Sequence, residues 1–201
     1  MSISNPIKYH VYTGQPLPAP FPYDYVLARQ GVVKRIETPH VYADALVSAG
    51  RPIAGLASWP FDVRLTVPKI PASWLCSVLD HARRVGTTDL VSQPIEQMYH
   101  FHYLETGWRV AVPRQEASAG RVSYRGGNEA TVGLDLHSHH EMPAYFSSTD
   151  DGDEQGARFY AVIGKIFTGP EIALRLGLYG DWLELDSCFL FDGLGPFRGV
   201  R

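Results

Sequence analysis

The sequence has little that would place the chain in a membrane or on a polyanion. Its apolar runs are far shorter than the roughly 18 to 20 residues of a membrane-spanning helix, and its first residues resemble no secretory signal peptide. The 18 Lys and Arg residues face 21 Asp and Glu residues and form no run, so no basic surface is predicted for nucleic acid or anionic lipid. We therefore expect a cytoplasmic protein that binds neither nucleic acid nor a membrane.

Cysteine is also scarce. Cys76 and Cys188 are the only two among 201 residues, which is too few for a disulfide framework. Both lie among mainly apolar neighbours in the sequence, so we expect reduced, buried thiols. A nucleophile formed by Cys76 with His81 is the less favoured alternative.

Proline density divides the chain. Prolines are frequent in residues 1–68, where they interrupt helices and strands, and β-like runs occur there at 9–12 and 25–35. We interpret 1–68 as a strand- and loop-rich region of unknown role. Residues 69–201 are predicted to form the main domain, and the sequence leaves open whether the first region packs on it or stands apart.

The second region alternates helical and extended patterns. Apolar residues recur at helical spacing between Pro71, which suits a first helical position, and Gly86, a typical stop. Strand-like patterns follow at 95–104, 108–112, 121–124 and 132–139, then a polar helix start at 147–156 and further strands at 158–167, 171–179 and 182–191. This order predicts a mixed α/β (α+β) fold.

Histidines and one carboxylate form the most informative pattern. On a strand His137 and His139 point to the same face, and Asp150 follows His139 by eleven residues at the predicted helix start. Two imidazoles and one carboxylate leave a fourth tetrahedral position open, as in catalytic zinc sites. Zinc (Zn²⁺) is the favoured metal, although ligand type alone leaves Fe, Co or Mn open.

The string His137-x-His139, seven residues, Ser147-x-x-Asp150 resembles the JAMM motif of the MPN-domain metalloproteases, a family that includes zinc deubiquitinases. The resemblance covers about residues 71–191 and implies a cytidine-deaminase-like fold, a mixed sheet flanked by helices. Residues 142–147 look most like the bacterial group called PRTRC system protein A, encoded beside ThiF-like and ParB-like proteins. One departure is His140, which stands where the family usually has proline.

The resemblance also implies roles. Glu96, which follows the first helix and opens a strand, would be the general base and acid, and Ser147 would donate to the oxyanion. His137, His139 and Asp150 would hold zinc. The implied reaction is hydrolysis of an amide or isopeptide bond in a protein or peptide, including a ubiquitin-like modifier, and a ThiF-like activating enzyme is the implied partner.

Several alternatives stay open at this stage. Glu105, Glu116 and Glu129 are nearer the histidines in sequence but lie in turn- or loop-like stretches. Ser147 could be only a helix N-cap. Asp135 could orient His137 or lie at the surface.

The remaining histidines are expected to be structural or exposed. His100 and His102 share a strand face without a carboxylate or thiol at ligand spacing, so we interpret them as structural, and we expect His140 to face solvent. The alternative function is a non-catalytic MPN-type scaffold or binding module. Deamination ranks last, because the Cys-x-x-Cys ligands of the zinc deaminases are missing.

Overall fold

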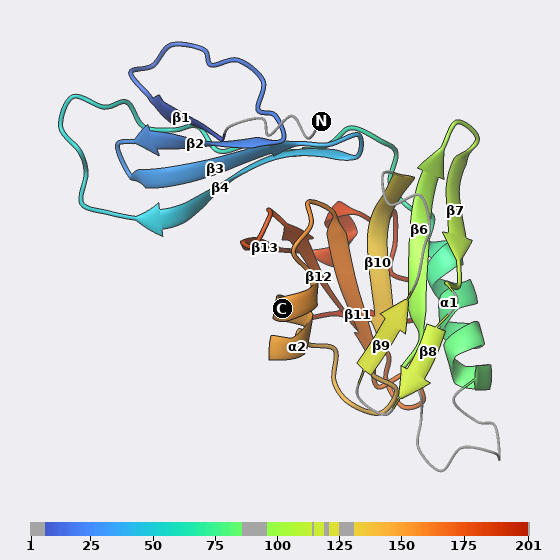
Figure 1. Cartoon of the computed structure of the whole chain (residues 1–201). Helices are drawn as coiled ribbons and strands as arrows, with labels where there is room; N and C mark the ends of the chain where they lie inside the picture. Colours follow the sequence, from blue (N-terminus) through green and yellow to red (C-terminus); the bar gives the residue numbers. More distant parts are fainter. Residues whose placement is uncertain (1–6, 86–95, 114, 119–120, 125–130, 201) are drawn as a thin grey trace. The chain divides into compact units, whose positions relative to one another are not determined.

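The computed structural model describes residues 7–85, 96–113, 115–118, 121–124 and 131–200 (Figure 1). The chain divides into two compact units, Met1–Val67 and Pro68–Arg201. Among the described residues, no helix has the length and apolar character needed to cross a membrane.

The first unit is a five-stranded sheet. In spatial order its strands are β1 (Lys8–Val11), β2 (Tyr23–Ala28), β3 (Gly31–Glu37), β4 (Val41–Ala49) and β5 (Val63–Leu65). β1 runs parallel to β2, and the other neighbours are antiparallel. We predicted no strand at the positions of β4 and β5.

The predicted single run at 25–35 is wrong, because it is a hairpin of β2 and β3. The chain turns before Gly31, which has a φ of 136° and approaches β4 so closely that a Cβ would lie 2.1 Å from the Ser48 carbonyl oxygen. Only glycine fits such a backbone contact. The hairpin therefore depends on one residue that the alternating pattern alone does not reveal.

A buried ion pair lies next to the core of this unit. The core contains Val26, Val33 and Trp59. The Arg35 guanidinium donates to both carboxylate oxygens of Asp24, at 2.8 and 2.5 Å, and both side chains are almost fully buried. Removing one partner would leave an uncompensated buried charge, which is strongly destabilising.

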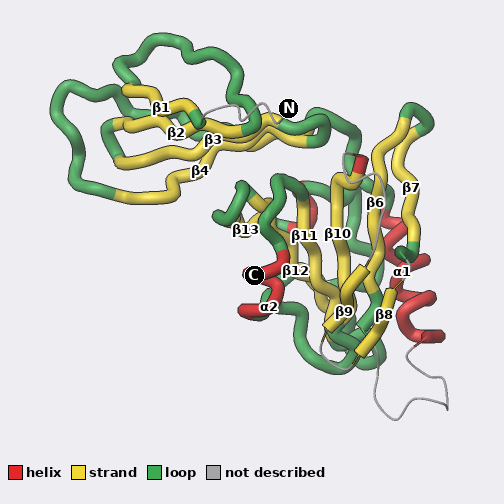
Figure 2. The backbone as a smooth tube through the Cα atoms, viewed as in Figure 1, coloured by secondary structure: helices red, strands yellow, loops and turns green. Residues whose placement is uncertain are grey.

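The second unit contains a mixed seven-stranded sheet (Figure 2). Its path runs β13 (Trp182–Leu185), β12 (Glu171–Gly177), β11 (Phe159–Gly164), β10 (Val132–Ser138), β6 (Met98–Leu104) and β7 (Gly107–Ala111), with β14 (Arg198–Gly199) beside β12. β10 pairs with β11 and β12 with β14 in parallel, and the other pairs are antiparallel. β8 (Gln115–Ser118) and β9 (Arg121–Tyr124) form a separate antiparallel pair. The predicted mixed α/β fold is confirmed.

Helix α1 (Ala72–Val85) lies along one face of this sheet, behind β6 and β7 (Figure 1). Its buried residues are spaced as the pattern predicted: Leu75, Val78, Leu79 and Ala82. Two polar contacts attach the helix to its surroundings. The His81 ring lies 2.9 Å from the hydroxyl of Tyr99 in β6. Arg83 donates to the carbonyl of Ile166, in the loop after β11, at 2.6 Å.

The predicted strand at 182–191 is too long. β13 ends at Leu185, and a 3-10 helix follows at Ser187–Phe189. The Asp186 side chain accepts a hydrogen bond from the Cys188 backbone N–H at 2.8 Å. This cap gives the backbone a partner outside the sheet and ends the strand.

The expectation of buried thiols is also wrong, because Cys76 and Cys188 are free and exposed. Cys76 follows the buried Leu75 on α1, and one residue along a helix turns the side chain by about 100°, off the apolar stripe. Cys188 lies in the 3-10 turn. Apolar neighbours in sequence were therefore a poor guide to burial at both positions.

Candidate metal centre

The proposed ligands project from the middle of the sheet. β10 lies between β6 and β11, and all seven of its residues are buried. Hydrogen bonds hold the backbone at the end of the strand and just past it: Ser138 N–H donates to the Gln97 carbonyl at 3.0 Å, and His139 N–H donates to the Ile163 carbonyl at 2.7 Å. His137 and His139 therefore sit on extended, anchored backbone, and their side chains share one face.

The chain then turns sharply at His140. This residue has a φ of 48°, and its carbonyl accepts from Ile166 N–H at 2.8 Å. The turn carries the ring inward, so His140 is buried and our expectation of a solvent-facing ring is wrong. Burial, with a contribution from His139, lowers its pKa.

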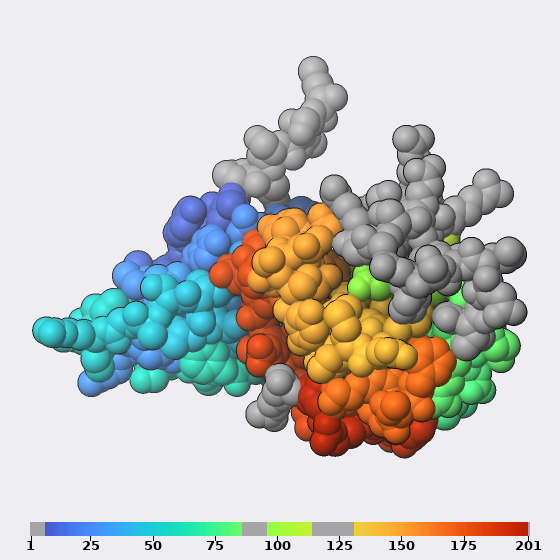
Figure 3. Space-filling model, turned by 90° about the horizontal axis from the view of Figure 1, so that it is seen from below, coloured from blue at the N-terminus to red at the C-terminus, as the bar shows by residue number. Residues whose placement is uncertain are grey.

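A glycine allows the returning loop to pack against β11. A Cβ on Gly164 would lie 2.4 Å from the Met142 carbonyl oxygen and from the Ala144 nitrogen, closer than any real side chain tolerates. The loop between β10 and helix α2 (Ser148–Asp153) belongs to the gold and orange part of the colour scale, and some atoms of that part are visible on the face drawn in Figure 3. The His137 and His139 side chains are only 8% and 5% exposed, whereas those of Asp150 and Glu96 are 18% and 24% exposed.

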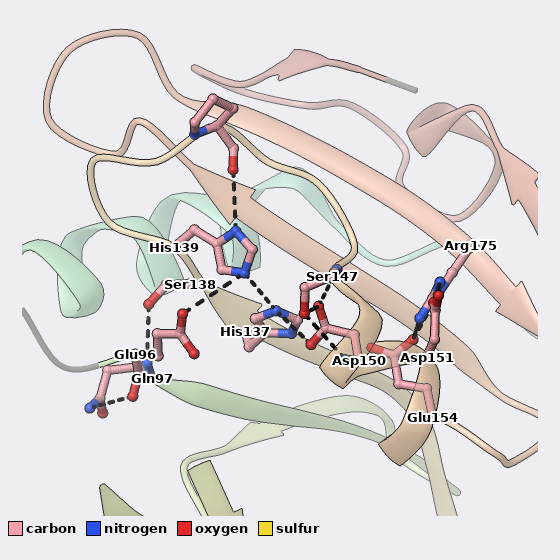
Figure 4. A network of polar contacts seen from close by, with 11 residues as sticks. Glu96, Gln97, His137, Ser138, His139, Ser147, Asp150, Asp151, Glu154 and Arg175 are labelled. Atoms are coloured by element: carbon pink, nitrogen blue, oxygen red, sulfur yellow. Dashed lines mark hydrogen bonds and ion pairs between the residues drawn. The ribbon is translucent and has the colours of Figure 1, made fainter. Parts of the chain in front are cut away.

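Three ligand atoms converge at this point (Figure 4). The Nε2 atoms of His137 and His139 are 3.1 Å apart, and His137 Nε2 lies 3.4 Å from Asp150 Oδ1. The candidate ligand atoms of these three residues all lie within 4.8 Å of one another. Neighbouring ligands of a tetrahedral zinc with bonds of about 2.0 to 2.2 Å are about 3.3 to 3.6 Å apart. The donor types fit such an ion, and the two separations measured from His137 Nε2 are close to this range.

The two imidazoles are prepared for ligation in different ways. His139 Nδ1 lies 3.2 Å from the Pro143 carbonyl oxygen, which fixes Nδ1 as the protonated nitrogen and leaves Nε2 with a lone pair. Burial lowers the pKa of His137 to about 4, against the opposing effect of Asp150. A neutral ring at physiological pH is the form that binds a metal.

Ser147 and Asp150 are joined by a capping box at the start of α2. The Ser147 hydroxyl and backbone N–H donate to Asp150 Oδ2 at 2.7 and 2.6 Å, and Asp150 N–H donates back to the hydroxyl oxygen at 3.3 Å. The N-cap role considered for Ser147 is therefore present. It also orients the carboxylate, because Oδ2 is held by Ser147 while Oδ1 faces His137.

Glu96 reaches the same point from the segment before β6. Its Oε1 lies 3.9 Å from His139 Nε2 (Figure 4). Burial raises its pKa, an effect that His139 opposes and Asp150 reinforces. A carboxylate with a raised pKa is better matched to proton transfer near neutral pH.

The structure adds no support for Glu105, Glu116 or Glu129 as the general base. Glu105 is exposed in the turn between β6 and β7. Glu116 belongs to β8, and Glu129 lies outside the described residues. The structure brings Glu96, His137, His139, Ser147 and Asp150 together.

Arg175 supports the site, although the sequence did not indicate this role. It is buried in β12, and its guanidinium binds Asp151 at 2.6 Å and Glu154 at 2.6 Å (Figure 4). The rings of Phe146 and Trp182 lie 4.0 and 4.8 Å from its central carbon. Arg175 thus ties the helix that carries Asp150 to the sheet, and the one available signal was a charged residue inside an apolar strand.

The second histidine pair forms a separate polar group. The His100 ring lies 3.5 Å from Asp135, which also pairs with Arg158 at 3.3 Å, and His102 lies 3.0 Å from the Thr131 hydroxyl. Asp135 is buried, so the surface alternative for it is wrong. Burial lowers the pKa of His100 to about 4, which fits the structural role that we expected.

Comparison with protein families gives a match over residues 77–177, to the family described as prokaryotic homologs of the JAB domain. The matched segment begins in α1, ends with β12, and contains Glu96, both histidines, Ser147 and Asp150. A search of curated proteins gives no significant match.

Proposed function

Because the chain belongs to the family of prokaryotic homologs of the JAB domain, we propose that it is a zinc-dependent hydrolase that cleaves amide or isopeptide bonds. One observation carries the proposal. Two imidazole nitrogens and one carboxylate oxygen, from His137, His139 and Asp150, lie within 4.8 Å of one another, and Glu96 lies beside them. Three protein ligands with a free fourth position are the pattern of catalytic rather than structural zinc.

The residues divide the chemistry between them. Zinc, when bound, polarises a carbonyl and lowers the pKa of water to about 7. The Glu96 carboxylate accepts the proton of the attacking water and then delivers it to the leaving amine, so that no covalent intermediate with the protein forms. The Ser147 hydroxyl, which donates to Asp150 at 2.7 Å, turns to donate to the developing oxyanion.

The motif resemblance supports a finer proposal about the substrate. It would be a protein or peptide joined to a ubiquitin-like modifier, in a cytoplasmic system of the PRTRC type with a ThiF-like activating enzyme as partner. The competing function is a scaffold of the same fold that binds a partner and hydrolyses nothing.

Comparison of Glu96→Gln with wild type tests the hydrolase proposal. The substrates are ubiquitin-like tails ending in Gly-Gly, joined through an amide bond to a fluorophore, with and without a chelator. We expect hydrolysis to fall by at least about 10²-fold in the variant while zinc content stays unchanged. The matched control, Glu105→Gln, changes an exposed glutamate in the β6–β7 turn and should keep full activity.

Two results would count against the proposal. Full activity in Glu96→Gln would remove that residue from proton transfer. Zinc far below one per chain, with no hydrolysis after reconstitution, would favour the scaffold.

A further inference from the structure

A cavity of about 500 Å³ adjoins the metal centre. Its aromatic wall is formed by Tyr145, Phe146 and Trp182, and small and aliphatic residues complete it. Tyr145 links the two sites, since its ring meets the His139 ring edge-on at a centroid distance of 5.0 Å. A substrate segment bound at the metal centre can therefore extend into this cavity.

The charges of the lining are unevenly exposed. The charged residues of the lining are Asp151, Arg175 and Glu184. The Arg175 side chain is only 6% exposed and is paired with Asp151 and Glu154, whereas the Asp151 side chain is 46% exposed. Glu184 is exposed as well. The positive charge is thus covered, and both charges that face solvent are negative.

Aromatic walls and exposed carboxylates complement one class of side chain. A lysine or arginine side chain has a long apolar stem that packs on rings and a cationic head that pairs with carboxylates or lies over an aromatic face. An acidic side chain would meet like charges, and an aliphatic one would bring no counter-charge to the exposed Glu184 carboxylate.

We propose that this cavity binds a basic side chain, lysine or arginine, of the substrate segment next to the scissile bond. The inference rests on the proposed function in treating the cavity as a subsite of a hydrolase. It goes further in naming the chemistry of the substrate, with Glu184 as the residue that selects for it.

Binding of short peptides to the full-length protein tests the inference without any hydrolysis. The probes are capped tetrapeptides Ala-Ala-X-Ala in which X is lysine, norleucine or glutamate, titrated at low salt while the Trp182 indole N–H signal is followed by NMR. Norleucine has the apolar stem of lysine without its charge. We expect the lysine peptide to shift the Trp182 signal and to bind roughly threefold or more tightly than the norleucine peptide.

The variant Glu184→Lys reverses one exposed charge of the cavity. We expect it to weaken binding of the lysine peptide roughly three- to tenfold and to leave the norleucine peptide within about twofold. The control Glu105→Lys makes the same change in the distant β6–β7 turn and should leave both affinities unchanged. Circular dichroism of both variants checks that the fold is intact.

Equal binding of the lysine and norleucine peptides, shifts that avoid Trp182, or no shift at the highest peptide concentration would each overturn the inference. The two proposals fail separately. If the protein binds the lysine peptide selectively but holds no zinc and hydrolyses nothing, the proposed specificity of the cavity stands and the proposed hydrolase function fails. If the protein hydrolyses its substrate with no preference for a basic residue next to the scissile bond, the hydrolase function stands and the proposed specificity of the cavity fails.

Discussion

Ser147 and Asp150 bind each other through both side chain and backbone: the Ser147 hydroxyl and N–H donate to Asp150 Oδ2, and Asp150 N–H donates to the hydroxyl oxygen. One capping box therefore starts helix α2 and orients the carboxylate whose other oxygen lies 3.4 Å from His137 Nε2. Helix capping and ligand placement are the same interaction.

Ser147→Ala separates the two roles of this serine. Loss of the cap should lower the free energy of unfolding by about 1 kcal/mol, while loss of an oxyanion donor should lower kcat about 10²- to 10³-fold. Chemical denaturation measures the first effect and steady-state hydrolysis the second. The neighbouring exposed Ser148, changed to alanine, is the control. A Ser147→Ala protein with near-normal kcat would leave capping as the only role.

Arg175→Met should loosen the helix that carries Asp150. The variant keeps the stem of the side chain but leaves Asp151 and Glu154 without their counter-charge. We expect a loss of about 3 kcal/mol of stability, moderated because burial already raises the pKa of Glu154 to about 8 and the carboxyl can take up a proton.

The same variant should bind zinc more weakly than wild type in a competition titration with a chromophoric chelator. Arg175→Lys, which retains the charge, should recover part of the affinity. Unchanged zinc affinity in Arg175→Met would show that the ion pairs stabilise the fold without positioning Asp150.

Local patterns predicted those parts of the fold and site that depend on neighbours in sequence. Helical spacing located α1, and alternation placed His137 and His139 on one face of β10, because both signals are set by backbone geometry alone. The hairpin at Gly31 and the inward turn at His140 were missed, since each depends on a backbone conformation with positive φ.

Contacts between strands of the sheet could not be predicted from the sequence either. Asp135 meets His100 because β10 and β6 are in a register that pairs these two residues, and no spacing rule reports register between strands 35 residues apart. In the same way, the fold brings Arg175 of β12 to Asp151 of α2, 24 residues earlier in the sequence. Glu96 could be proposed only from the motif resemblance, and the fold then brought it within 3.9 Å of His139.

Both thiols should react in the folded protein. Cys76 and Cys188 are free and exposed, so we expect two thiols per chain to be titrated by a coloured disulfide reagent under native conditions, without a change in circular dichroism. The Cys76→Ser variant should lose one of the two. Reaction of either thiol only after addition of denaturant would contradict the exposure seen here.

The buried ion pair of the first unit predicts a local effect. Asp24→Asn should lower the stability of that unit by about 3 to 5 kcal/mol, because Arg35 would keep its charge in a buried site. The exposed pair Asp62 and Arg64 is the matched contrast, and Asp62→Asn should cost less than about 1 kcal/mol. Calorimetry of both variants measures the difference, and similar losses would argue against a special role for burial.

The location of a bound zinc ion tests the account most directly. Anomalous scattering at the zinc edge, from crystals of the full-length protein grown with zinc, should give one strong peak per chain. We predict that this peak lies about 2.0 to 2.2 Å from His137 Nε2, His139 Nε2 and an Asp150 carboxylate oxygen, with Glu96 close by. A crystal with no peak at these residues, or with zinc held instead by His100 and His102, would contradict the proposed metal centre.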